Sequence, residues 1–354
     1  MPPLDNGGPP YGPGPRDAPF APTNVSLPRP ISRWLSIAGD IGSLALLRGA
    51  LDAGERTETL LATCLIWCLT DVFTYRQGIS SWQIHLQGIG ALLDGSEAHR
   101  SFRSAMRHLY QLYLSLQTLP HIPTVESLEN PAQLGVRASQ NSEWTSITSP
   151  EIDGFLGYSS ELLDVLQQID QLSRSVSGNE AQSILFEADI LLGKVQGMIR
   201  RDTTSPRDIS ICTPLSPEYN REFVLCHQTF QQATLIHLYR KLYHHPSGSQ
   251  SIQAAVRSIE EMVGNMIQGQ PCHTWVAMAM PLFTLGCEAF TEKQQAFTRD
   301  KIKKLEDCIG SLHVKCIRQA LEDIWKEREN LGDREGTLCA SQLLAELRYN
   351  IILF

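Results

Sequence analysis

The chain has 354 residues, of which 42% are hydrophobic and 19% are charged, and its net charge is -8 at pH 7. That length can bury a sizeable core and allows either one large domain with appendages or two domains. An acidic chain does not attract the phosphate backbone of nucleic acids by itself. The longest apolar stretches, Cys64–Leu69 and Trp275–Cys287, are too short to cross a membrane, which requires about 20 residues.

The first part of the chain divides into a tail and helical segments. Proline and glycine dominate residues 1–30, and we predict a disordered tail there, followed by a helical domain over residues 31–354. Leu60–Phe73 is apolar nearly all round, which predicts a buried helix. Turn residues without a sustained period predict flexible loop insertions at about 119–158, in the centre of the chain, and at 201–217.

The second half of the chain has helical periodicity. Apolar residues recur at steps of three and four over Ile252–Ile267 and over Val314–Trp325. Thr291 followed by Gln294 resembles a capping box that opens another helix. Because convincing alternation at period two is absent, the sequence predicts an all-α fold, an irregular bundle of about ten to twelve helices with few or no strands.

The spacings that bring metal ligands or catalytic groups together are missing from the sequence. No Glu or Asp stands three residues before any of the ten histidines, and Cys-x-x-Cys does not occur. Acidic pairs such as Glu306 and Asp307 are expected on solvated helix faces. We therefore predict no metal site, no cofactor and no catalytic residue, and hence no enzyme. The nine cysteines fit a reducing compartment, because most of them lie in apolar helical patterns.

One stretch, SSWQIHLQGIGALLD, has unusual residues at the positions of a family pattern: Trp82, His85, Leu86, Gly88, Leu92 and Leu93. Trp82, Leu86 and Leu93 share one helical face, and Gly88 is expected to let a neighbouring helix approach closely. His85 lies at the edge of that face. It is either a partly buried structural histidine or a residue of a ligand pocket.

A second stretch follows the same family pattern: Trp275, Pro281, Leu282, Gly286 and Glu288, followed by ALEDIW, which ends at Trp325. Pro281 is expected to kink or to start a helix, because its ring and missing N–H are incompatible with a helix interior. Gly286 costs helix stability of the order of 1 kcal/mol, which is tolerable where it permits close packing. These residues are expected to identify a fold rather than a site.

Together with TLIHLYRKLYHHPS at Thr234–Ser247, the two stretches resemble the fungal-specific transcription factor domain. This is the helical regulatory region that follows a binuclear zinc cluster in many fungal transcription factors. The resemblance implies a transcription regulator in the nucleus; without it, a cytoplasmic location fits as well. The six clustered cysteines of that family have no counterpart here, since the first cysteine is Cys64. A truncated gene and a relative that kept only its regulatory half both fit this pattern.

The resemblance implies regulation through protein partners, a homodimer or a small effector, with DNA involved only indirectly and no membrane. Trp82, His85, Trp275 and Phe283 are candidates either for an effector pocket between helices or for the plain core. The alternative function is a helical enzyme of secondary metabolism. A cluster of convergent carboxylates in one cavity would favour that enzyme, and a dry core with surface charges would favour the regulator.

Overall fold

A computed structural model describes residues 57–74, 82–94, 104–119, 148–174, 181–204, 209–210, 216–268, 273–333 and 336–347, with residues 349, 351 and 353. By its contacts the chain divides into residues 1–46 and residues 47–354, and every described residue belongs to the second unit. The predictions for the tail over residues 1–30 and for most of the central insertion lie outside the described residues.

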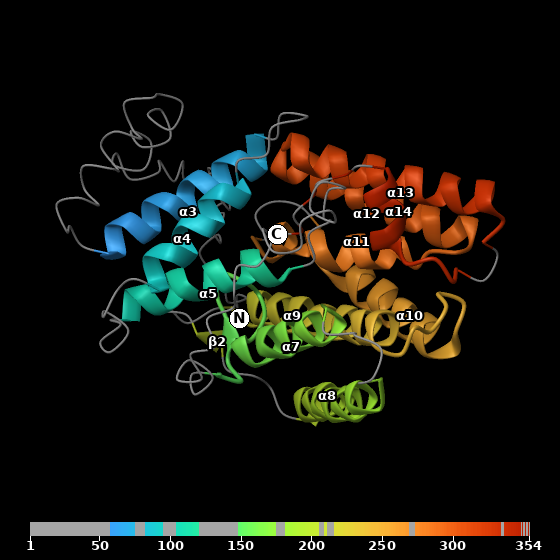
Figure 1. Cartoon of the computed structure of the whole chain (residues 1–354), viewed down its shortest axis with the longest axis horizontal. Helices are drawn as coiled ribbons and strands as arrows, with labels where there is room; N and C mark the ends of the chain where they lie inside the picture. The colour runs from blue at the N-terminus through green and yellow to red at the C-terminus, as the bar shows by residue number, and fades with distance from the viewer. Residues whose placement is uncertain are drawn as a thin grey trace, which may run out of the picture. The chain divides into compact units, whose positions relative to one another are not determined.

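The described residues are mainly helical, as predicted (Figure 1). Their elements, in chain order, are α3 (Thr57–Thr74), α4 (Trp82–Asp94), α5 (Ser104–Thr118), β1 (Ile152–Asp153), α7 (Ser160–Arg174), α8 (Ala181–Thr204), β2 (Ile209–Ser210), α9 (Pro217–Lys241), α10 (Gln250–Asn265), the 3-10 helix η3 (His273–Met278), α11 (Ala279–Cys287), α12 (Glu292–Ile309), α13 (Leu312–Leu331) and α14 (Ala340–Glu346).

Helix α9 is the element around which much of the core is built. It packs against α7, α8, α10, α11 and η3. Its first turn is well defined, because the Ser216 side chain accepts a hydrogen bond from the N–H of Tyr219 and Pro217 occupies the first helical position. Buried residues, among them Phe223, Phe230 and Leu238, occur on several sides of the helix. Neighbouring elements therefore cover α9 on several sides.

The helices α3, α4 and α5 pack against one another, and α3 also contacts α13. Leu61, Leu65 and Cys68 of α3 are buried, and so are Trp82 and Ile89 of α4. The predicted apolar face of α4 is thus confirmed where its side chains are described. The side chain of Leu93 lies outside the described residues.

The second family stretch forms a tight crossing of α11, α12 and α13. The chain changes from η3 to α11 just before Pro281, so the proline lies in the first turn of the helix, where its missing N–H costs nothing. A Cβ added to Gly286 would lie 2.6 Å from Leu321 Cδ1 and 3.0 Å from Thr298 Cγ2. The close approach predicted for Gly286 is confirmed. The capping box of Thr291 and Gln294 is also confirmed at the start of α12.

Two short strands pair with each other: β1 precedes α7, and β2 follows α8. Ile152 pairs in parallel with Ile209, and Asp153 pairs with Ser210. These strands are two residues long, in agreement with the expectation of few or no strands. They also place the described end of the central insertion beside the described part of residues 201–217.

Two expectations were wrong, both about which face of a helix a residue occupies. Gly88 is exposed, and a Cβ added there would meet no atom within 4 Å, because α4 packs through the face that carries Trp82 and Ile89. Glu306 was expected on a solvated face but is 7% exposed. Its carboxylate lies 3.0 Å from Arg318 Nε, so the burial of its charge is compensated by an ion pair with α13.

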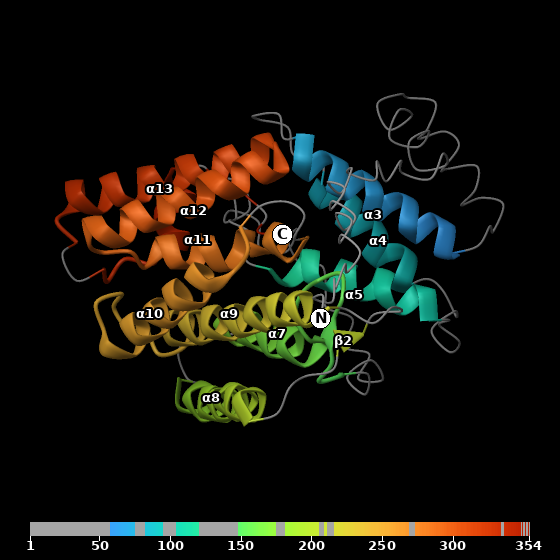
Figure 2. The same cartoon turned by 180° about the vertical axis from the view of Figure 1, so that it is seen from behind.

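No helix in the described part of the chain is both long enough and apolar enough to cross a membrane. Figure 2 shows the same helices from behind.

Candidate functional site: a buried arginine cluster and an adjoining pocket

Arg240 lies in the last turn of α9 and is almost fully buried. Its Nη1 donates to the carbonyl oxygens of His245 (2.7 Å) and Gly336 (2.9 Å), and its Nη2 donates to the carbonyl oxygen of Leu338 (2.7 Å). A buried guanidinium also needs a counter-charge. Glu288 supplies it, with Oε1 3.3 Å from Arg240 Nε. These bonds attach the C-terminal end of α9 to the turn that contains Gly336 and Leu338, which lies far away in the sequence.

Glu288 is the residue that ends α11, and only 4% of its side chain is exposed. Its backbone N–H still bonds to carbonyl oxygens of the helix, which holds the backbone of Glu288 at the helix end. One carboxylate oxygen, Oε1, faces Arg240. The other, Oε2, is buried without a hydrogen-bond partner. A buried acceptor without a donor is rare in folded proteins.

A second buried arginine, Arg328 of α13, binds the same turn. It donates to the carbonyl oxygens of Cys287 and Leu338, the latter at 3.2 Å. Asp333 Oδ2 lies 4.0 Å from Arg328 Nε. Burial acts to raise the pKa of Asp333, but hydrogen bonds from Thr337 and Leu338, with the charge of Arg328, hold that pKa below its ordinary value. Asp333 is therefore a stable anion, and the cluster contains two cations and two anions.

Gly336 also belongs to the cluster, and its position has no room for a side chain. Its φ is +67°, and an added Cβ would lie 2.4 Å from the ring of Phe290 and 2.6 Å from Ser247 Cβ. Its carbonyl oxygen accepts hydrogen bonds from Arg240 and from the backbone N–H of Ser247 (3.1 Å). Arg240, Arg328 and Gly336 thus hold α9, α11, α13 and the approach to α14 together.

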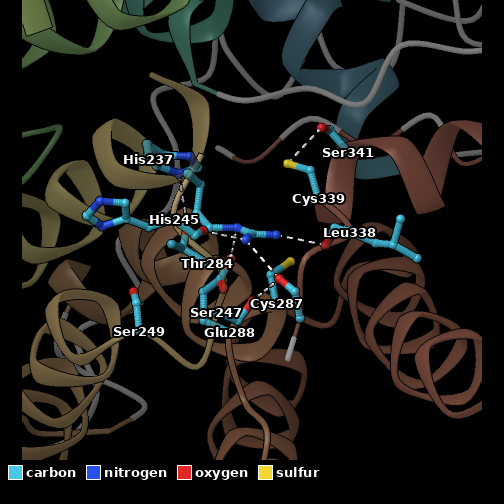
Figure 3. Close-up of polar contacts among 12 residues, drawn as sticks. His237, His245, Ser247, Ser249, Thr284, Cys287, Glu288, Leu338, Cys339 and Ser341 are labelled. Carbon is cyan, nitrogen blue, oxygen red and sulfur yellow. Dashed lines mark hydrogen bonds and ion pairs between the residues drawn. The ribbon is translucent and has the colours of Figure 1, made fainter. Parts of the chain in front are cut away.

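A small pocket of about 80 Å³ opens beside this cluster. Its described lining comes from α9, the end of α11, the start of α14 and Leu353, and consists of Ile236, His237, Arg240, Lys241, Phe283, Thr284, Cys287, Glu288, Cys339, Ala340, Ser341, Leu344 and Leu353. Figure 3 shows the labelled His237, Thr284, Glu288 and Cys339 converging from these elements. The wall is mostly apolar, with a few polar groups at fixed places, as is typical of small-molecule sites.

The polar side chains of this wall are mostly uncharged or paired. Burial, with the positive charge of Lys241, lowers the pKa of His237 to about 3, so the imidazole is neutral at pH 7. His237 Nε2 lies 3.0 Å from Thr284 Oγ1. Lys241 Nζ lies 3.3 Å from Asp170 Oδ1. Burial raises the pKa of the Cys287 thiol well above its usual value, which makes it a poor nucleophile.

The chemistry of this arrangement favours binding. The described lining contains one carboxylate, Glu288, whereas acid–base catalysis of the kinds expected for a helical enzyme needs convergent groups with separated pKa values. Within the described residues, no three His, Cys, Asp or Glu side chains are grouped so that they could hold a metal ion.

The predicted pocket residues lie in different parts of the fold. Trp82 and His85 belong to α4, and His85 Nε2 lies 3.0 Å from Asp71 Oδ2 of α3. Trp275 is fully buried in η3. Phe283 of α11 is part of the described lining of the pocket beside Glu288, and the other three are not. Their role as effector-binding residues stays a prediction.

The family-pattern residues have structural contacts. Leu86 and Pro281 are buried, and the indole Nε1 of Trp325 donates to the carbonyl oxygen of Gly286 at 2.8 Å. Sequence reasoning selected Glu288 but missed Arg240. The signal that could have found Arg240 is its spacing, since it follows Ala233 and Ile236 on the buried stripe of α9.

A buried polar group also escaped the sequence reasoning. His227 Nε2 lies 3.2 Å from Asp202 Oδ2, and Gln231 Nε2 donates to the same oxygen at 2.5 Å. His227 and Gln231 are four residues apart on α9 and therefore reach the same point on α8. This group joins the two helices.

The comparison with known families decides the identity of the fold. A fungal specific transcription factor domain matches residues 42–351. The chain belongs to this family. The match covers every described helix, so the arginine cluster and all of the described pocket lining except Leu353 lie within the fungal-specific transcription factor domain. No curated protein and no solved structure matches the chain significantly.

Proposed function

We propose that this protein regulates transcription in the nucleus and does so by contacting another protein through an exposed apolar face of α8. The observation that supports regulation of transcription is the family match over residues 42–351. The contact with a partner is proposed from the distribution of apolar side chains along one helix.

Helix α8 has apolar residues on two faces. Ile184, Ala188 and Leu191 are buried on one face, and α8 contacts α7 and α9. Leu185, beside that face, is 45% exposed, and Phe186 and Ile190, on the opposite side of the helix, are 65% and 40% exposed. Single exposed apolar side chains are ordinary, but a group of large ones on one helix is typical of protein interaction sites.

The geometry of α8 suits a helix-mediated contact. Phe186 and Ile190 are four residues apart, so their side chains are neighbours along the helix. Exposed Glu187 lies next to Ile190 around the helix, and exposed Asp189 lies between Leu185 and Phe186, so charged groups border the apolar side chains. In both views α8 lies on the outer side of α7 and α9 (Figures 1 and 2), where a partner can reach it. We refer to Leu185, Phe186 and Ile190 as the α8 patch.

A tethered reporter experiment tests this proposal. The full chain is fused to an unrelated DNA-binding domain and directed to a reporter promoter in a fungal cell. We expect the fusion to change transcription of the reporter, and the double variant Leu185→Glu with Phe186→Glu to abolish that change. The control, Gln196→Glu with Thr203→Glu, adds the same charge at exposed positions of α8 more than one turn away from the patch and should keep the effect. A fusion that leaves the reporter unchanged would contradict regulation of transcription.

The same variants distinguish a different partner from a second copy of the chain. Sedimentation velocity of the purified chain measures its oligomeric state over a range of concentrations. A dimer that the double variant dissociates would identify the partner as a second copy. A monomer at all concentrations, with the reporter effect still lost in the double variant, would identify a different protein. An effect that survives in the double variant would remove the α8 patch from the proposal.

A further inference from the structure

We propose that the partner of the α8 patch is a second copy of this chain, and that the two α8 helices pack antiparallel about a twofold axis between Gly193 and Gly197. This inference rests on the α8 patch of the proposed function and names its occupant. Three observations on the outer face of α8 support it: exposed apolar side chains, a charge pattern that complements itself when the helix is reversed, and two glycines with open space around them.

The outer face of α8 is turned away from the helices that hold it. Among the described elements, α8 packs mainly against α7 and α9, and its buried face carries Ile184, Ala188 and Val195. Phe186 and Ile190 lie on the opposite side of the helix and are 65% and 40% exposed. In both views α8 is the outermost of the described helices on its side (Figures 1 and 2). A helix of another molecule can therefore pack along this face.

The exposed charges of α8 change sign along the helix. Its exposed acidic residues lie in the first half of the helix and its exposed basic residues in the second half: Glu187, Asp189, Lys194, Arg200 and Arg201. Asp189 and Arg200 are eleven residues apart, which is about three turns, so both lie on the same side of the helix. This side of α8 is therefore negative towards one end and positive towards the other.

This charge pattern determines the direction of the second copy. In a parallel pair with the same register, Asp189 would face Asp189 and Arg200 would face Arg200, and like charges would repel each other. In an antiparallel pair, Asp189 of each chain faces Arg200 of the other, and the twofold axis produces this ion pair twice. Antiparallel packing is therefore the arrangement that the charges favour.

Both side chains of this ion pair keep hydrogen-bonding capacity for a partner. The Tyr243 hydroxyl donates to Oδ1 of Asp189, which leaves Oδ2 as an acceptor. Arg200 is exposed, and its guanidinium carries several N–H donors. Its neighbour Arg201 is instead paired with Glu161 of α7 at 2.7 Å. Arg200 is therefore the basic residue at this end of α8 that a second copy engages.

Two glycines lie where the helices cross. The midpoint of the two ion pairs falls between Gly193 and Gly197. Both glycines share the face that carries Ile190, at steps of three and four residues. An added Cβ on either glycine would meet no atom within 4 Å, so the described residues do not fill the space beside them. Glycine weakens a helix interior, but it lets a second backbone approach closely. In the antiparallel pair, Ile190 of each copy lies within one turn of Gly197 of the other and fills that space.

Sedimentation velocity of the purified full chain, over a range of concentrations, tests the dimer. We expect the wild-type chain to dimerise. Asp189→Arg and Arg200→Asp should each raise the dissociation constant of the dimer at least about tenfold, because each places like charges opposite each other in both pairs. The combined variant reverses both charges and should recover most of that loss. An equal mixture of the two single variants should also dimerise, since their heterodimer again pairs opposite charges.

Glycine variants test the crossing. Gly193→Leu places a large side chain between the two helices and should weaken the dimer at least about tenfold. Its surroundings within the chain are open, so the fold should be kept. Gly264→Leu is the matched control at an exposed glycine of α10 with equally open surroundings, and it should leave the dimer unaltered. Lys326→Asp and Glu329→Arg make equal charge changes at exposed positions of α13 and should also leave it unaltered.

Three results would overturn the proposal. The first is a chain that stays monomeric at every soluble concentration. The second is a dimer that Arg200→Asp or Gly193→Leu leaves unchanged, and the third is a combined charge variant that recovers nothing. Circular dichroism checks that each variant is folded. Asp189→Arg removes the bond from Tyr243; if that variant is unfolded, Arg200→Asp and Gly193→Leu decide the test.

Failure of the dimer and failure of the proposed function give different results. Sedimentation needs no promoter, and the reporter experiment does not measure the oligomeric state. A dimer that follows the charge variants, together with an unchanged reporter, would support the α8 dimer and reject regulation of transcription. A monomeric chain whose reporter effect is lost in the Leu185→Glu, Phe186→Glu variant would keep the proposed function and reject the second copy.

Discussion

Trp325 of α13 donates its indole N–H to the carbonyl oxygen of Gly286 in α11, with 2.8 Å between Nε1 and the oxygen. This bond forms at the crossing where Gly286 has no room for a side chain, since an added Cβ would lie 2.6 Å from Leu321 Cδ1. Two residues of the family pattern therefore contact each other directly, which explains why a glycine and a tryptophan are needed at these places.

The first prediction concerns this crossing. Gly286→Leu should destabilise the protein by about 1–3 kcal/mol, because the larger side chain overpacks against Leu321 and Thr298. Gly88→Leu is the matched control. Gly88 has open space around it, and leucine favours a helix over glycine by somewhat less than ~1 kcal/mol, so stability should stay the same or rise slightly. Chemical denaturation measures both, and equal effects would contradict the assigned packing.

The second prediction concerns the buried arginine cluster. Arg240→Met should destabilise the protein by about 3–5 kcal/mol, because it leaves the Glu288 carboxylate buried without a counter-charge. The double variant Arg240→Met with Glu288→Leu removes both charges and should recover a large part of that loss. Arg299→Met, which breaks an exposed pair with Glu322, should cost at most about 1 kcal/mol. Urea unfolding of the three variants measures their free energy of unfolding and tests whether breaking a buried ion pair lowers it more than breaking an exposed one.

The third prediction is a dependence of stability on pH. The pKa of His237 is about 3 in the folded protein, below the ordinary value, so the unfolded chain binds a proton first as the pH falls. Stability from this residue is complete above about pH 6.5 and is lost progressively between about pH 6.5 and pH 3.

His237→Gln should therefore flatten the pH dependence of the melting temperature over that range. The control is His244→Asn at an exposed position, which should keep the wild-type slope. If His237→Gln follows the wild-type curve, His237 does not stay neutral in the folded protein.

The fourth prediction separates this chain from the zinc and DNA binding that its family suggests. The cysteines are dispersed along the sequence, and the net charge is -8. A zinc cluster needs closely spaced thiolates, and DNA recognition needs basic residues that contact phosphates. The purified chain should contain no stoichiometric zinc and show no preference among promoter duplexes at physiological salt. Elemental analysis and fluorescence anisotropy measure this. About two zinc ions per chain, or tight binding to one duplex, would contradict it.

Features that depend on local sequence could be predicted. The capping box at Thr291, the helix start near Pro281 and the apolar stripes of α10 and α13 follow from backbone and side-chain preferences within one or two turns. The close approach at Gly286 was also correct. The same inference failed at Gly88, because a glycine does not reveal which helix face another helix will cover.

The site depends on contacts between distant segments, and most of it could not be predicted. Arg240 meets Gly336 and Leu338 only after α9 and α13 have packed together. A charged residue on an apolar stripe indicates a buried ion pair but does not name its partner. The unsatisfied oxygen of Glu288 is visible only when every neighbouring donor has been placed.

The most direct test of the central claim, that the protein regulates transcription through the α8 patch, is nascent-RNA sequencing after rapid depletion of the protein in the cell that expresses it. A defined set of transcripts should change soon after depletion. The wild-type chain should restore their synthesis, and the Leu185→Glu, Phe186→Glu variant should not. Unchanged nascent transcription after complete depletion, or full rescue by that variant, would contradict the claim.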